Sequence, residues 1–156
     1  MFNSLNAPGA MAVTLAAARM SPGLIDALRG PLREWEVLRL TTSPETMDRE
    51  AQMNQTFHFA IYRACGSDVL LPMIESLWLQ SGPYVRAAVL KFDPKSEISA
   101  LHYHREILAA LKARDAEAAK RALASDISRA FDLLRDTPLT DSEPAPPAKR
   151  RYRRKT

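Results

Sequence analysis

Hydrophobic residues recur at helical spacing along most of this 156-residue chain, and no run alternates between apolar and polar residues as a half-buried strand does. Three sites carry a helix-start signal, a capping side chain followed by a proline suited to the first helical turn: Ser21-Pro22, Ser43-Pro44 and Asp93-Pro94. The pattern therefore predicts an all-α fold, an antiparallel helical bundle of six to eight helices with short connections.

Two further residues mark where helices end and begin. Gly66 is suited to a helix C-terminus, and Asp115 is suited to capping the last helix. Residues 1–10 and 137–156 are expected to be disordered, which leaves one domain over residues 11–136. The expected helices span residues 11–20, 22–29, 31–40, 44–65, 68–80, 83–91, 94–113 and 116–135, with a kink at Pro83 separating the fifth from the sixth.

Four polar residues interrupt the apolar faces of three of these helices. Asn54 and His58 lie one turn apart on the helix expected at 44–65. His104 and Asp126 interrupt the apolar stripes of the helices expected at 94–113 and 116–135. Because an unpartnered buried carboxylate is costly, Asp126 is expected to have a cation, a metal or hydrogen-bond donors beside it. Two imidazoles and a carboxylate suit a divalent metal such as Zn, Ni or Mn. The spacing is equally compatible with core histidines bonded to backbone carbonyls and to Asp126.

Composition limits the class of protein. The single cysteine, Cys65, excludes a disulfide framework and a Cys-rich zinc site, and it fits a reducing compartment. No apolar stretch approaches the roughly 20 residues of a membrane span, and the N-terminus lacks the basic residues of a signal peptide. A cytoplasmic protein without membrane contact is therefore expected.

The net charge of +4 comes from the C-terminal tail, whose six cations leave the first 148 residues with a charge of about −2. Prolines precede this basic segment, as in a disordered arm. Such an arm would bind nucleic acid phosphates or an acidic membrane surface weakly and without sequence preference, or it would simply be solvated. The six cations are Lys149, Arg150, Arg151, Arg153, Arg154 and Lys155.

Two segments also resemble a known family. The runs NQTFHFAIYRACGSDVLLPMIESLW and HREILAALKARDAEAAKRALASDI are similar to the FCD domain, the effector domain of the FadR subgroup of GntR bacterial transcription regulators. The likeness runs from about residue 11 to residue 136. It implies a bundle that is not an enzyme, that binds a metal and a small organic acid effector, and that forms a homodimer.

The resemblance also implies a ligand set for the metal. The family's ligand positions correspond to Asn54, His58, His104 and Asp126 in this chain. Two identities differ, because an Asp is usual at position 54 and a His is usual at position 126. A shorter carboxylate at the last position is expected either to lower the affinity for the metal or to shift the preference toward harder ions.

Three more residues are predicted to contact the effector: Arg86 as a clamp for its carboxylate, with Trp78 and Tyr62 as pocket walls. An exposed Arg86 and two core aromatics are the alternatives. The family's winged helix-turn-helix is absent from the ten residues before the first expected helix, so DNA contact is expected only through an absent domain or the basic tail. A stand-alone dimerising module with a degenerate pocket, or a small metal-dependent enzyme, are the alternative functions.

Overall fold

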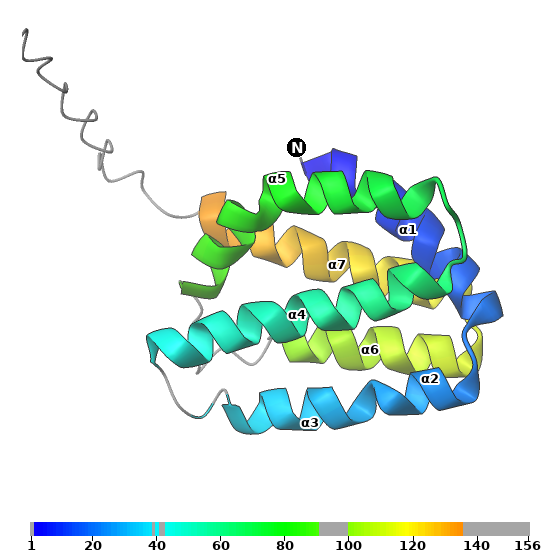
Figure 1. The fold of residues 1–156 in the computed structure, drawn as a ribbon, viewed down its shortest axis with the longest axis horizontal. Coiled ribbons are helices and arrows are strands. Elements are labelled where there is room, and N and C mark those ends of the chain that lie inside the picture. Colours follow the sequence, from blue (N-terminus) through cyan, green and yellow to red (C-terminus); the bar gives the residue numbers. More distant parts are fainter. Residues whose placement is uncertain (1, 39, 41–42, 91–99, 136–156) are drawn as a thin grey trace, which may run out of the picture.

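The computed structural model describes residues 2–38, 40, 43–90 and 100–135, and these residues form seven helices and no strand. The all-α prediction is therefore confirmed. Along the chain α1, the consecutive pair α2 and α3, α4, α5, α6 and α7 alternate in direction, and α2 and α3 follow one another along one edge of the bundle (Figure 1). The helices are α1 (Phe2–Arg19), α2 (Pro22–Ala27), α3 (Arg29–Leu38), α4 (Pro44–Ala64), α5 (Leu70–Leu90), α6 (Ala100–Ala113) and α7 (Ala116–Arg135).

One hydrophobic core lies between these helices. The last helix, α7, packs against α1, α5 and α6, while α4 packs against α1, α3 and α5. The largest fully buried apolar side chains come from five of the helices and interdigitate there; they include Val13, Phe57, Ile61, Ile74, Ile107, Leu111 and Leu123. Because α4, α6 and α7 all face this core, a polar residue on the inner face of each is brought close to the other two.

The predicted helix caps are confirmed wherever the structure describes them. The hydroxyl of Ser21 accepts a bond from the α2 backbone, and Ser43 and Thr46 form a reciprocal capping box at the start of α4. Gly66, just beyond α4, has φ +61°, the left-handed conformation that favours glycine. The carboxylate of Asp115 accepts a bond from the α7 backbone. These caps fix the register in which α4 and α7 present their side chains.

The N-terminal segment departs from expectation, because α1 begins at Phe2 rather than at residue 11 and residues 2–10 are helical. Pro8 and Gly9 resemble a helix break in sequence, yet both are buried. A Cβ at Gly9 would lie 3.3 Å from the Tyr62 hydroxyl and 3.4 Å from a methyl of Leu123, so glycine lets α1 approach α4 and α7 closely. Tertiary packing outweighs the local signal here.

The region around Pro83 also differs, since α5 is a single helix where two were expected, over residues 68–80 and 83–91. A proline removes one backbone hydrogen bond and crowds the preceding turn, and the ribbon of α5 bends in its last turns without ending (Figure 1). The helix packs against α1, α4 and α7, and this packing keeps it continuous.

Smaller differences concern α2, α3 and α6. Helix α2 ends at Ala27 and α3 begins at Arg29, each two residues before the boundary expected for it. Helix α3 ends at Leu38, two residues before the expected end at residue 40. Helix α6 is described from Ala100, so the expected start at Asp93-Pro94 lies outside the described residues. No described helix has both the length and the apolar character that crossing a bilayer requires.

Candidate functional site

His58 occupies the inner face of α4, where it is almost fully buried at 2% exposure. Its ring lies 5.6 Å from that of Phe57, 5.9 Å from that of Tyr62 and 5.7 Å from that of Trp78. The side chain is thus enclosed by aromatic rings from α4 and α5. A polar imidazole enclosed in this way needs a hydrogen-bond or metal partner on the side that the rings do not cover.

His104, on α6, is fully buried and held between two aromatic rings. The ring of Phe57 stacks on it with centroids 4.4 Å apart, and the ring of Trp35 lies at 4.9 Å on a tilted plane. These contacts leave the imidazole little freedom to rotate. Its Nε2 atom is therefore held in a fixed direction.

Asp126, on α7, completes the group. Its Oδ2 atom lies 3.1 Å from Nε2 of His58 and 3.2 Å from Nε2 of His104. The two Nε2 atoms are themselves 3.1 Å apart. Three residues from three helices, separated by 46 and 22 positions in sequence, thus direct one ligand-type atom each toward a common point.

The triangle of atoms has dimensions that suit a metal ion. Ligand atoms about 2.1 Å from an ion lie about 3.0 Å apart in octahedral geometry and about 3.4 Å apart in tetrahedral geometry. The three observed separations, 3.1, 3.1 and 3.2 Å, lie within this range. The donor set, two imidazole nitrogens and one carboxylate oxygen, also matches what Zn, Ni or Mn accept. These residues therefore fit a divalent ion.

The protonation states suit a metal as well. Burial alone would raise the pKa of Asp126, but its contacts with His104 and His58, from which the carboxylate accepts hydrogen bonds, outweigh burial and hold the pKa below its usual value. Burial lowers the pKa of His104, and this effect exceeds the opposing attraction of Asp126. At neutral pH the site therefore holds an ionised carboxylate and a neutral His104, the forms that bind metal.

Several buried polar atoms around the triangle have no hydrogen-bond partner among the described residues. They are Nδ1 of His58, Nδ1 of His104, Nε1 of Trp35 and the hydroxyl of Tyr62. Burial, with the charge of Asp126 adding to it, raises the pKa of Tyr62, so its hydroxyl keeps its proton and can donate. Because buried polar groups are normally bonded, these atoms leave hydrogen-bonding capacity that a polar ligand or water could satisfy.

The fourth predicted ligand, Asn54, is half-buried one turn before His58. The converging histidine and acidic side chains are His58, His104 and Asp126, and Asn54 would add an amide oxygen rather than a carboxylate. Its role as a ligand stays a prediction. The remaining histidine, His102, is exposed and pairs with Glu106 at 3.4 Å, as its position two residues from His104 predicts.

Two of the three predicted effector contacts, Tyr62 and Trp78, lie beside the buried site. Tyr62 is fully buried and Trp78 half-buried, and both rings lie within 6 Å of the His58 ring. Both therefore adjoin the site, whether or not they touch an effector. The side chain of Arg86 lies outside the described residues, as do the six basic residues of the tail.

Two residues near the site were not predicted. Trp35, on α3, covers one face of His104, and the apolar stripe of its helix was the only sequence signal for it. Arg129 lies one turn after Asp126 on α7, and its charge opposes protonation of His104. Its spacing of three residues from Asp126 was a usable signal, since it places both side chains on one helix face.

Known proteins share this arrangement of sequence and fold. The family model for the FCD domain matches residues 9–129. The HTH-type transcriptional regulator McbR of Escherichia coli (strain K12) is 29% identical over 124 residues, which cover 80% of this chain and 55% of that protein. The structure of E. coli McbR/YncC superposes with a TM-score of 0.73 at 26% identity, covering 83% of this chain and 63% of that chain.

This chain thus spans less than two thirds of the length of either relative. The matched residues 9–129 run from the first turns of α1 into α7 and include the three converging side chains. From this match, the chain belongs to the FCD domain family of GntR-type regulators.

Proposed function

We propose that this chain is the effector-sensing domain of a GntR-type transcription regulator, that it acts by binding rather than by catalysis, and that it works in the cytoplasm. Its relative McbR is named as an HTH-type transcriptional regulator. Family membership supports an effector-binding role, and we propose the buried polar site as the place where the effector binds.

The proposed metal is a divalent ion, Zn, Ni or Mn, held by His58, His104 and Asp126. One observation carries this proposal: the convergence of three ligand atoms within 4.8 Å of one another inside the core. A bound ion would supply a Lewis-acidic centre with positions open to an oxygen ligand. The aromatic rings of Phe57 and Trp35 hold His104 in place, so the protein keeps the ligand atoms together without relying on the ion.

The proposed effector is a small organic acid. A carboxylate is the ligand type that an electropositive buried centre favours, and the protonated Tyr62 hydroxyl adjoins the site as a hydrogen-bond donor. Trp78 contributes a wall next to His58, and Arg86 is proposed as an additional clamp. An effector bound here would touch α4, α5 and α7 together, because all three line the site.

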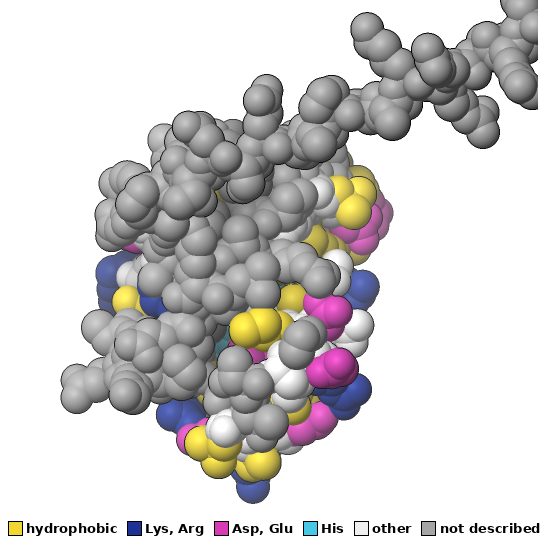
Figure 2. Space-filling view, turned by 90° about the vertical axis from the view of Figure 1, so that its left-hand side faces the viewer, with side chains coloured by type: hydrophobic (Ala, Val, Ile, Leu, Met, Phe, Trp, Pro, Cys, Tyr) yellow, Lys and Arg dark blue, Asp and Glu magenta, His cyan; other side chains and the backbone are white. Residues whose placement is uncertain are grey.

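The response is proposed to be a change in the geometry of a homodimer. Effector binding can shift a two-state equilibrium only if the effector binds one state more tightly. DNA contact would then come from a winged helix-turn-helix connected to this domain, or weakly from the basic tail. On the face seen in Figure 2, the described side chains include acidic, basic and hydrophobic types side by side.

Metal analysis of the untagged full chain tests the site. Wild type purified without chelator is expected to contain close to one divalent ion per chain, and His58→Ala and Asp126→Ala are expected to lose at least about nine tenths of it. The matched control is His102→Ala, which removes an exposed histidine of α6 and should retain the wild-type content.

Equally low metal in all four proteins, even after dialysis against Zn, Ni or Mn, would contradict the metal proposal and favour a module with a degenerate pocket. A thermal-shift screen of small carboxylates on the metal-loaded chain then tests the sensor proposal. Binding stabilises the folded state by mass action, so an effector should raise Tm in wild type and not in His58→Ala. No shift with any carboxylate would contradict the choice of effector class.

A further inference from the structure

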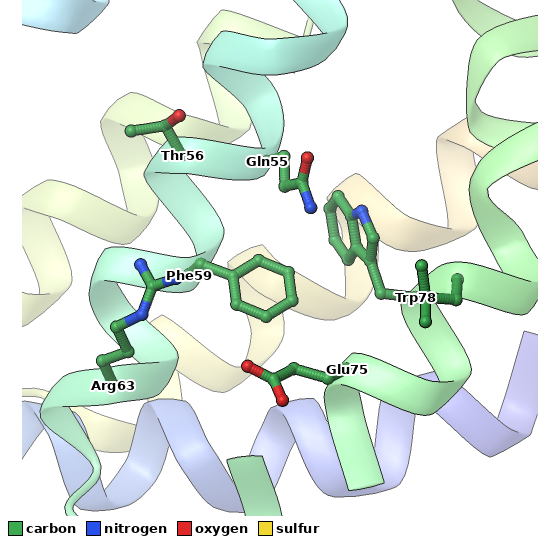
Figure 3. Close-up of a pocket in the computed structure, with 7 residues that line it drawn as sticks. Gln55, Thr56, Phe59, Arg63, Glu75 and Trp78 are labelled. Carbon is green, nitrogen blue, oxygen red and sulfur yellow. The ribbon is translucent and has the colours of Figure 1, made fainter. Parts of the chain in front are cut away.

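A second pocket opens on the outer side of the bundle, between α4 and α5 (Figure 3). Its volume of about 380 Å³ is within the range of small-molecule sites. It is distinct from the buried triangle, because none of its lining residues is His58, His104 or Asp126. The lining residues are Gln55, Thr56, Phe59, Arg63, Glu75, Trp78 and Leu79.

Two aromatic rings form its apolar wall. Phe59 and Trp78 meet edge to face, with centroids 5.3 Å apart and planes at 82°. Phe59 is 5% exposed and Trp78 is half-buried, so their orientations are fixed by the core behind them. Figure 3 shows the Phe59 ring in the middle of the pocket, with Trp78 on one side and Arg63 on the other. An apolar group of modest size would find a rigid surface here.

Opposite charges flank this wall. The guanidinium of Arg63, in the last turn of α4, lies 5.5 Å from the centre of the Phe59 ring. The carboxylate of Glu75 reaches in from α5 (Figure 3). No ion pair joins these two side chains to one another or to any other described residue. A cation and an anion therefore line one pocket without neutralising each other.

Elsewhere on the bundle, similar residues on neighbouring helices do form pairs. Arg49 of α4 binds Glu34 of α3 at 2.7 Å, and Arg105 of α6 contacts Glu36 of α3 directly. The open arrangement of Arg63 and Glu75 is thus not a general property of this surface. It leaves room between the two charges for a ligand that carries both complementary charges.

We propose that this pocket binds a small zwitterion of amino-acid type with an apolar side chain. Its carboxylate pairs with Arg63, its ammonium group pairs with Glu75, and its side chain packs on Phe59 and Trp78. Gln55 offers an amide at the rim, while the hydroxyl of Thr56 donates to the Gln52 carbonyl and contributes mainly its methyl group. The proposal does not depend on a metal or on the function proposed for the buried site.

Trp78 connects the two sites, because its ring lines the outer pocket and lies 5.7 Å from the His58 ring. Its fluorescence therefore reports on the outer pocket directly. A Trp35→Phe variant leaves Trp78 as the single tryptophan of the chain. Calorimetry on the unmodified chain gives the same information if that variant does not fold.

The test is calorimetric titration of the chelator-treated full chain with three probes. L-phenylalanine carries both charges, its methyl ester lacks the carboxylate, and N-acetyl-L-phenylalanine lacks the ammonium group. Phenylalanine is expected to bind at least about tenfold more tightly than either blocked form, because each blocked form loses one charge-assisted contact. Its addition should also change Trp78 fluorescence.

Variants assign the binding to the pocket. Arg63→Gln and Glu75→Gln should each weaken phenylalanine binding about tenfold or more, whereas the exposed control Arg33→Gln should not. Chelator treatment keeps the buried site free of metal in all of these measurements, so binding in the outer pocket is measured separately from the proposed metal site. Absence of binding at millimolar concentrations, equal binding of the three probes, or unchanged binding in Arg63→Gln and Glu75→Gln would each overturn the proposal.

Discussion

His58 and Phe59 are neighbours in sequence on α4, yet they belong to opposite environments. His58 turns inward to a site where three polar groups lie within 3.2 Å of each other and are almost fully removed from water. Phe59 lines an outer pocket whose charged groups, Arg63 and Glu75, are exposed. Burial determines how much a polar residue contributes to stability. Substitutions at the inner site are expected to lower the free energy of unfolding, whereas substitutions at the outer pocket should act mainly on binding.

The largest effect is expected from Asp126→Ala. In the metal-free protein this change leaves Nε2 of both His58 and His104 without their carboxylate partner inside the core. The free energy of unfolding should fall by about 1–3 kcal/mol at pH 7, the usual cost of unsatisfied buried polar groups. Urea denaturation followed by circular dichroism measures it. A midpoint equal to that of wild type would show that the inner site is not energetically coupled to the fold.

The dependence of the unfolding free energy on pH is the next largest expected effect. The pKa of His104 is lowered in the folded protein by burial, so the unfolded chain binds a proton first as the pH falls below its own value of about 6.5. The pKa of Asp126 is also lowered, so the stability that its ionised form contributes is present above about pH 3.9 and is lost as the pH falls further. Both effects reduce stability in acid.

The expected profile of the metal-free chain is therefore a decline in unfolding free energy from pH 7 downward, with a first phase starting near pH 6.5. His104→Gln should flatten that first phase, and the matched exposed variant His102→Gln should leave it in place. Urea midpoints at intervals of half a pH unit distinguish the two. An identical profile in wild type and His104→Gln would contradict the lowered pKa of this histidine.

The smallest effects are expected on the surface. A double-mutant cycle of Arg49→Gln and Glu34→Gln should give a coupling of about 0.2–1 kcal/mol, as for other exposed ion pairs. The same cycle on Arg63 and Glu75 should give a coupling near zero without ligand, because no ion pair joins them. A larger coupling in the second cycle would mean that the outer pocket is already closed by its own charges in solution.

The sequence predicted the features that depend on local chemistry. Capping side chains at Ser21, Ser43 and Asp115, and the glycine at position 66, act over one helical turn, so their roles can be read from spacing alone. The inward direction of His58, His104 and Asp126 follows from helical periodicity in the same way. That their atoms meet at one point required the resemblance to a known family or the structure itself.

The features that escaped prediction depend on contacts between helices. Helix α1 continues through Pro8 and Gly9 because that segment packs against Tyr62 and Leu123, and no local pattern reports such packing. The outer pocket combines residues of α4 and α5, and nothing in the sequence distinguishes its charged residues from other exposed charged positions. The contact between the Trp35 ring and His104 likewise joins α3 to α6, and no local pattern reports it.

The close packing at Gly9 places α1 against Tyr62, which adjoins the buried site. The Gly9 backbone lies so close to the Tyr62 hydroxyl that a single added carbon would be 3.3 Å away, and the Tyr62 ring in turn packs beside that of His58. Tyr62, whose ring plane is inclined by 26° to that of His58, therefore contacts both α1 and the buried imidazole. A shift of the Tyr62 ring toward α1 would bring its hydroxyl against the Gly9 backbone, so we expect the position of the first helix to depend on that ring.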